Sequence, residues 1–250
     1  MTTPPGMEQQ VRQANQRFYN LIAPRYEEID GRRTSKTLLW LRRRLQLVAE
    51  RSGGGYLLDL GCGSGVMMRS AAGLFDEVVG IDISTGILAL AKEHGTALCA
   101  DGSALPLASA SMDAVVCFAA LHHIYDHQPL LAEVYRVLRP GGVFYADHDM
   151  TLAFSNRFHW PLALYRTLFN GCRRYQRADN RLDRELYQLT EIHEQGIDQD
   201  QLLKQLGQSG FSEITTQYHW YGLNPWVDRL FGERPRSKGM APLLALWATK

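Results

Sequence analysis

The segment Leu57-Leu-Asp-Leu-Gly-Cys-Gly-Ser-Gly65 constrains this chain more than any other part of it. Its first four residues are an apolar run, interrupted by Asp59, of the kind found in a parallel strand that is covered on both faces. The loop that follows has glycine at every second position: Gly61, Gly63 and Gly65. Glycine has no Cβ, so the backbone can turn sharply and a ligand can lie against it. Residues 66–74 then read as a short helix whose N-terminal N–H groups face the same spot. This order predicts a site for a nucleotide-type ligand.

The details of the loop distinguish between two kinds of nucleotide. The fingerprint of dinucleotide-binding proteins is G-x-G-x-x-G, and Val66 stands where its third glycine would fall. Asp59 also places a carboxylate beside the loop, which repels a pyrophosphate and attracts an ammonium group. A nicotinamide oxidoreductase therefore fits this loop poorly.

At this point the sequence resembles the class I S-adenosylmethionine-dependent methyltransferases, whose first motif is acidic-x-Gly-x-Gly-x-Gly. Their ligand has a cationic amino-acid end, an adenosine end and no phosphate, which suits the loop. Residues 77–84 form a second apolar segment that ends at Asp82, where a carboxylate can accept both ribose hydroxyls. Asp101 resembles the family's contact with the adenine amine. Residues 111–124 and 131–144 match the next two motifs, and the closest likeness is to the branch that includes the quinone and menaquinone methyltransferases.

The order of predicted elements implies an α/β fold with a Rossmann-like, doubly wound sheet of seven strands. Strands and helices alternate up to Asp147, and the resemblance implies that the last strand, near 242–249, is antiparallel to the others. Residues 150–195 break the alternation and read as two or three helices. We expect an N-terminal helical lid (1–51), a cofactor-binding core (52–149), a helical insertion that covers the substrate (150–195) and the C-terminal part of the core (196–250).

The resemblance implies that the cofactor is S-adenosylmethionine and that its contacts fall on the matching motifs. Tyr26 lies in a segment that resembles the lead-in of the quinone branch, where an aromatic residue folds over the cofactor; ordinary packing of a short helix is an equal alternative. The predicted cofactor contacts are Tyr26, Asp59, Gly61, Cys62, Gly63, Gly65, Asp82, Ile83, Asp101, Gly102, Ser103, Phe118, Ala119 and His123.

Catalytic residues are harder to predict, because a sulfonium donor already has an excellent leaving group. The protein must align the donor and the acceptor, and it needs a base only where the acceptor loses a proton. Our candidates are His123, which follows the fourth strand, and Asp147 and His148 at the end of the fifth. One histidine of the pair at 122 and 123 has the alternative role of capping its loop. The segment Asp147-His148-Asp149 has three further readings: a substrate anchor, part of a divalent-metal site, or a helix cap at Asp149. We assign no metal ligands.

Composition limits the partners. The net charge is +1, no run of about eighteen apolar residues occurs, and the four cysteines lack metal-like spacing, which favours a cytoplasmic protein without an integral membrane segment. The segment Phe118-Ala-Ala-Leu-His-His123 lacks the Asp/Asn-Pro-Pro-aromatic loop typical of amino-adenine methylation, which argues against a nucleic-acid substrate. Arginines and aromatic residues in 150–195 suggest a planar or acidic small-molecule acceptor. A cofactor-binding regulator without turnover remains an alternative to an enzyme.

Overall fold

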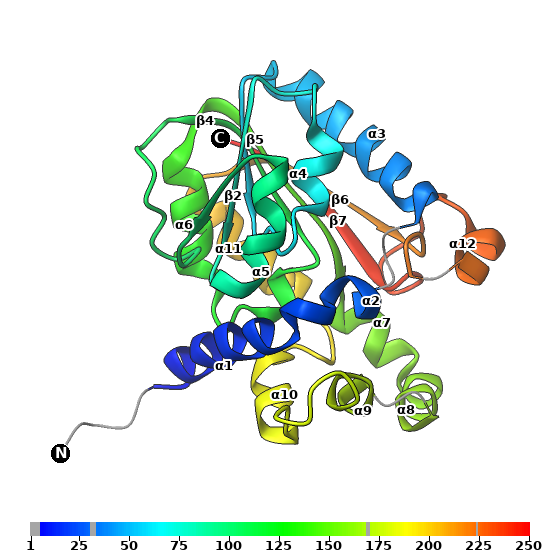
Figure 1. Ribbon diagram of the computed structural model, residues 1–250. Helices are drawn as coiled ribbons and strands as arrows, with labels where there is room; N and C mark the ends of the chain where they lie inside the picture. Colours follow the sequence, from blue (N-terminus) through cyan, green and yellow to red (C-terminus); the bar gives the residue numbers. More distant parts are fainter. Residues whose placement is uncertain (1–5, 31–33, 169–170, 224) are drawn as a thin grey trace.

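The computed structural model describes residues 6–30, 34–168, 171–223 and 225–250 (Figure 1). Parts of two predicted segments therefore lie outside the described residues: 1–5 and 31–33 of the N-terminal lid, and 169–170 of the insertion. Residue 224 lies outside them as well.

The described residues form one seven-stranded sheet in the order β3-β2-β1-β4-β5-β7-β6. The strands are β1 (Tyr56–Leu60), β2 (Glu77–Asp82), β3 (Thr96–Cys99), β4 (Met112–Phe118), β5 (Leu138–Met150), β6 (Ser212–His219) and β7 (Leu243–Thr249). β7 is antiparallel to both of its neighbours, β5 and β6, whereas the pairs from β3 to β5 are parallel. The predicted sheet, with its antiparallel last strand, is confirmed.

Helices cover both faces of the sheet, as the doubly wound prediction requires (Figure 1). The α-helices ahead of β5 are α1 (Met7–Ile22), α2 (Tyr26–Asp30), α3 (Ser35–Ser52), α4 (Val66–Ala71), α5 (Thr85–Ala91) and α6 (His127–Val137). Those after it are α7 (Leu152–Arg157), α8 (His159–Leu168), α9 (Gly171–Gln176), α10 (Arg184–Thr190), α11 (Gln199–Ser209) and α12 (Pro225–Phe231). Three 3₁₀ turns are η1 (Ala23–Arg25), η2 (Lys92–His94) and η3 (Leu121–His123). One buried core joins α3 and α4 to the sheet, and a second joins α6 and α11 to it.

Local sequence explains where several helices begin and end. The Thr34 side chain accepts a hydrogen bond from the N–H of Thr37 and so starts α3, which Gly53 ends in the left-handed region at φ +78°. Asp126 caps α6 and Asp198 caps α11 in the same way. Because β5 continues to Met150, it runs three residues beyond the alternation that the sequence pattern showed.

The insertion holds four short helices in its described residues, α7 to α10, where two or three were expected. α12 was not predicted at all. It has no buried residue, so it leaves no periodic apolar face from which a helix can be read.

The carboxyl ends of β1 to β4 meet at one edge of the sheet, and α1, α2 and α10 lie against that edge (Figure 1). α1 is held to the insertion by aromatic contacts: the Phe18 ring lies 5.0 Å from Tyr175 and 6.5 Å from Tyr187. The N-terminal helix thus packs on the inserted helices, and the role of these segments as a lid stays a prediction.

Candidate functional site

A hollow of about 1180 Å³, its open mouth included, lies between this edge of the sheet and α1. Twelve of the fourteen predicted cofactor contacts line it: Tyr26, Gly61, Cys62, Gly63, Asp82, Ile83, Asp101, Gly102, Ser103, Phe118, Ala119 and His123. The two that do not line it are Asp59 and Gly65. The catalytic candidates Asp147 and His148 do not line it either.

The glycine loop forms the floor of this hollow. Gly61 and Gly63 have φ values of +70° and +53°, and a Cβ on Gly61 would lie 2.7 Å from the Cβ of Ala120. The N–H groups of Gly61 and Cys62 both donate to the carbonyl of Ile81, which fixes the loop to β2. A Cβ on Gly63 would lie 3.8 Å from the Tyr26 hydroxyl, so the Tyr26 side chain points toward the loop. The absence of side chains here leaves a cradle for a ligand.

Asp82 connects the end of β2 to the loop. Its Oδ2 accepts from the N–H of Gly63 at 3.0 Å, and its Oδ1 accepts from the N–H of Ser84 at 2.9 Å. Burial raises the pKa of this carboxyl, and the N–H groups of Ser84 and Gly63 oppose that shift. Each oxygen retains a lone pair for a ligand hydroxyl, as the predicted ribose contact requires.

Asp59 is fully enclosed beneath the loop. Neither carboxylate oxygen makes a hydrogen bond of normal geometry within the described part of the chain. Burial raises the pKa of Asp59 to about 8; the charge of Asp82 adds to the rise, and the N–H of Met68 opposes it. Asp59 is therefore mostly protonated at neutral pH and does not line the pocket, and its direct contact with a ligand cation stays a prediction.

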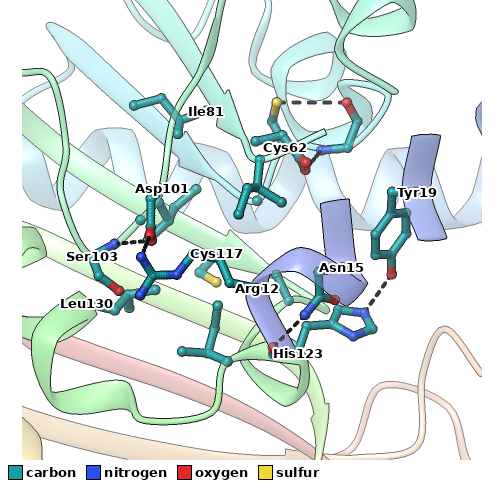
Figure 2. Close-up of a pocket in the computed structure, with 18 of the residues that line it drawn as sticks. Arg12, Asn15, Tyr19, Cys62, Ile81, Asp101, Ser103, Cys117, His123 and Leu130 are labelled. Atoms are coloured by element: carbon teal, nitrogen blue, oxygen red, sulfur yellow. Dashed lines mark hydrogen bonds and ion pairs between the residues drawn. The ribbon is translucent and has the colours of Figure 1, made fainter. Parts of the chain in front are cut away.

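The predicted adenine contact, Asp101, already has a cationic neighbour. Its Oδ2 lies 2.6 Å from Nη1 of Arg12, and its Oδ1 accepts from the N–H of Ser103 at 2.9 Å (Figure 2). Arg12 comes from α1 and also pairs with Glu8 one turn earlier. Nothing in the sequence singles out Arg12. It lies four residues after Glu8 on a helix, and this spacing of opposite charges is typical of any exposed helix face.

His123 lies on η3 and lines the pocket, where residues of α1 and of the insertion form hydrogen bonds with it. Its Nδ1 lies 2.8 Å from the carbonyl oxygen of Thr190, which can only accept, so Nδ1 carries the proton. Nε2 therefore accepts from the Tyr19 hydroxyl at 2.6 Å, and Asn15 donates to the His123 carbonyl (Figure 2). Burial, reinforced by the neighbouring His122, lowers the pKa of His123 to about 4. His123 is thus neutral at physiological pH, with a basic nitrogen directed at a phenol.

His122 has the loop-holding role that was the alternative for this pair. Its Nδ1 lies 2.7 Å from Oδ1 of Asp149, which also accepts from the N–H of His122 at 3.0 Å. Asp149 is buried, and the helix after it, α7, begins at Leu152 with Thr151 in the N-cap position and no side-chain cap. The helix-capping interpretation of Asp149 is therefore wrong. Its carboxylate orients η3 and leaves His123 to face the pocket.

Asp147 and His148 belong to a buried cluster behind the pocket wall. Asp147 accepts from Nδ1 of His148 at 3.0 Å, from Nε2 of His219 at 2.8 Å and from the Tyr145 hydroxyl. These donors, with the charges of His219 and His148, hold the pKa of Asp147 far below its ordinary value although burial alone would raise it. The His148 ring lies 4.3 Å from that of Phe118, which does line the pocket. The pair therefore supports the wall, and a direct catalytic role for it remains only a prediction.

The donor set suits the ligand that the sequence motifs indicated. The pocket offers Asp82 beside a glycine cradle, Asp101 beyond it, and an apolar wall of Phe118 and Ala119. Among the described residues, Arg12 is the one lysine or arginine that lines it, and Arg12 already pairs with Asp101. Such a set fits a nucleoside that carries an amino acid rather than a phosphate.

Comparison with known proteins agrees with this chemistry. A methyltransferase domain family matches residues 58–146. A probable S-adenosylmethionine-dependent methyltransferase of Mycolicibacterium smegmatis is 32% identical over 139 residues, which cover 51% of this chain and 52% of the relative. The demethylmenaquinone methyltransferase of Thermus thermophilus is 34% identical over 135 residues, which cover 50% and 61%. The chain thus spans between half and two thirds of the length of these curated relatives.

The fold extends the likeness beyond the matched segment. The crystal structure of an S-adenosylmethionine-dependent methyltransferase from Thermotoga maritima superposes with a TM-score of 0.57, covering 93% of this chain and 99% of its own, at 15% identity. Residues 58–146 thus match the methyltransferase domain family, and the chain as a whole has the fold seen in the class I S-adenosylmethionine-dependent methyltransferases.

Proposed function

We propose that this chain transfers the methyl group of S-adenosylmethionine to a small molecule that loses a proton in the reaction, either a phenolic or enolic hydroxyl or an enolisable carbon. The observation that carries this proposal is the contact between Tyr19 and His123 at the pocket wall. An amine that is already neutral needs no base, whereas a hydroxyl or an enolisable carbon does. The demethylmenaquinone methyltransferase among the relatives is in keeping with an acceptor of this kind.

The bound cofactor supplies an electrophilic methyl group on a sulfonium. Asp82 and the glycine loop would hold its sugar, Asp101 its adenine and Tyr26 the end nearest the loop. Our assignment of these roles follows the motif positions and the pocket wall that they line.

The proton path follows from the hydrogen bonds of His123. The carbonyl of Thr190 fixes the proton on Nδ1, so Nε2 is the free base of the pair. A proton leaving the acceptor passes to the Tyr19 oxygen while the Tyr19 proton passes to Nε2, and His123 becomes an imidazolium. Because its pKa is about 4, this base is weak, so the proton moves only as the methyl group is bonded and the acceptor becomes acidic.

The test is methyl transfer from labelled S-adenosylmethionine to a panel of quinols, phenols, enolisable ketones, amines and carboxylates. We expect transfer to the first three classes. In Tyr19→Phe, kcat should fall by roughly 10²–10⁴-fold, the range of general acid–base catalysis, while cofactor affinity stays unchanged. Tyr125→Phe is the matched control, since it removes a hydroxyl from another tyrosine that lines the same pocket and has no part in the proposed cofactor contacts or proton path. Transfer to amines alone, full activity in Tyr19→Phe, or cofactor binding with no transfer at all would each reject the proposal.

A further inference from the structure

Helix α8 leaves most of its large apolar side chains in solvent. Trp160 is 78% exposed, Leu164 63% and Leu168 68%, and no residue of this helix is buried. Tyr165 is 56% exposed on the same helix. Soluble proteins seldom expose so much contiguous apolar surface unless it meets a partner.

Positive charge is concentrated around this helix. Residues 151–182 contain one acidic residue, Asp179, which pairs with Arg181 at 2.6 Å. The same segment contains no lysine and six arginines: Arg157, Arg166, Arg173, Arg174, Arg177 and Arg181. The whole chain has a net charge of only +1, so the excess is local. The segment that carries the exposed apolar side chains is therefore rich in arginine, whereas residues 183–194 after it hold four acidic side chains and one arginine.

Helix α12 provides a second exposed apolar element. Trp226 is 80% exposed and Leu230 is 76% exposed. The Phe231 ring of α12 stacks on Trp220 at 4.5 Å, and Trp220 meets Phe154 of α7 edge-on at 5.1 Å. Since α7 leads directly into α8, these contacts connect the two exposed helices, and both project from the right side of the molecule in Figure 1.

We propose that α8 and α12 dock the chain onto the surface of an anionic lipid bilayer. Tryptophan, tyrosine and leucine beside arginine are the side chains that favour the boundary between headgroups and acyl chains. Anionic headgroups attract the arginines of the segment. No helix in the described ranges is long and apolar enough to cross a bilayer, so the contact is with the surface.

The charge argues against a second copy of the chain as the occupant. A twofold contact through α8 would bring two basic segments together, which like charges oppose. This docking rests on no step of the methyl transfer, so it stands or falls separately from the proposed function.

The experiment is flotation of the purified full chain with vesicles of phosphatidylcholine alone or mixed with phosphatidylglycerol. We expect binding to the mixed vesicles, and weaker binding when the salt is raised from about 0.1 M to about 1 M, which shortens the Debye length from about 10 Å to about 3 Å. Leu164→Ser should weaken partitioning roughly thirtyfold, since one buried leucine contributes about 2 kcal/mol. Leu47→Ser, at an exposed leucine on α3, is the matched control and should leave it unchanged.

Charge reversal gives an independent arm. Arg173→Glu with Arg174→Glu should weaken binding to the mixed vesicles at least roughly tenfold, since each arginine near such a surface contributes about 1 kcal/mol. The control pair, Arg69→Glu with Lys204→Glu, changes the net charge by the same amount at exposed positions of two other helices, α4 and α11. It should have little effect on vesicle binding. Thermal melting of each variant checks folding. The proposal is overturned if the wild type does not float, if both charge pairs act alike, or if Leu164→Ser dissociates an oligomer in lipid-free solution and leaves flotation unchanged.

Discussion

Replacing Asp59 by asparagine should remove a loss of folding stability that grows as the pH rises. Burial raises the pKa of this carboxyl from 3.8 to about 8, so between these values the folded chain keeps a proton that the unfolded chain has released. Stability therefore falls as the pH rises through this window, by about 1.4 kcal/mol per pH unit. The asparagine variant lacks this slope. From about pH 5 to about pH 7 its free energy of unfolding should gain about 2.7 kcal/mol relative to the wild type.

The assay is urea unfolding of the cofactor-free chain, followed by circular dichroism at about pH 5, 6 and 7 for both proteins. The exposed Asp200, which pairs with Lys238 at 2.7 Å, provides the control. The Lys238 ammonium lowers the pKa of Asp200, so Asp200→Asn should differ from the wild type by the same amount at each of these pH values. If the difference between Asp59→Asn and the wild type is equally flat, Asp59 is ionised in the folded chain and our account of the loop is wrong.

Three further outcomes follow from the geometry. Gly61→Ala should lower the melting temperature and weaken cofactor binding, measured by calorimetry, more than Gly73→Ala does. Both glycines have φ near +70°, but of the two only Gly61 has a neighbour, Ala120, within 3 Å of the new Cβ. Equal effects of the two substitutions would contradict this. The rate should show no acidic limb near pH 6.5 and should fall only toward about pH 4, where His123 takes up a proton; a limb at about 6.5 in the pH–rate profile would argue against it. Gly222→Ala would bring its Cβ into conflict with Nε2 of His148 and should cost roughly 1–3 kcal/mol in urea unfolding, and an unchanged midpoint would refute this close packing.

The sheet and the floor of the site could be predicted because local patterns carry them. Leucine and valine runs reveal buried parallel strands, and the polar residues at their ends, such as Asp82 and Asp101, share one edge in any sheet of this order. The loop at Gly61 and Gly63 is similarly local, since its backbone angles demand glycine.

The walls of the site depend on contacts between distant segments, and the sequence pattern does not reveal these. Arg12 and Tyr19 reach the pocket because α1 packs against α10, more than 160 residues later. His219 is the partner of the buried Asp147 carboxylate across 72 positions, a separation that no local pattern reveals. The burial of Asp59 is equally hidden in the sequence, because nothing in the motif indicates how completely the loop encloses this carboxylate.

The attachment of α1 has a consequence for timing. Tyr19 and Asn15 both reach His123 from this one helix, and Arg12 on the same helix holds Asp101. Any departure of α1 that admits a ligand must also dismantle the phenol–imidazole pair. On the proposed proton path an open molecule would lack its base, and methyl transfer would require α1 to close over the bound ligands.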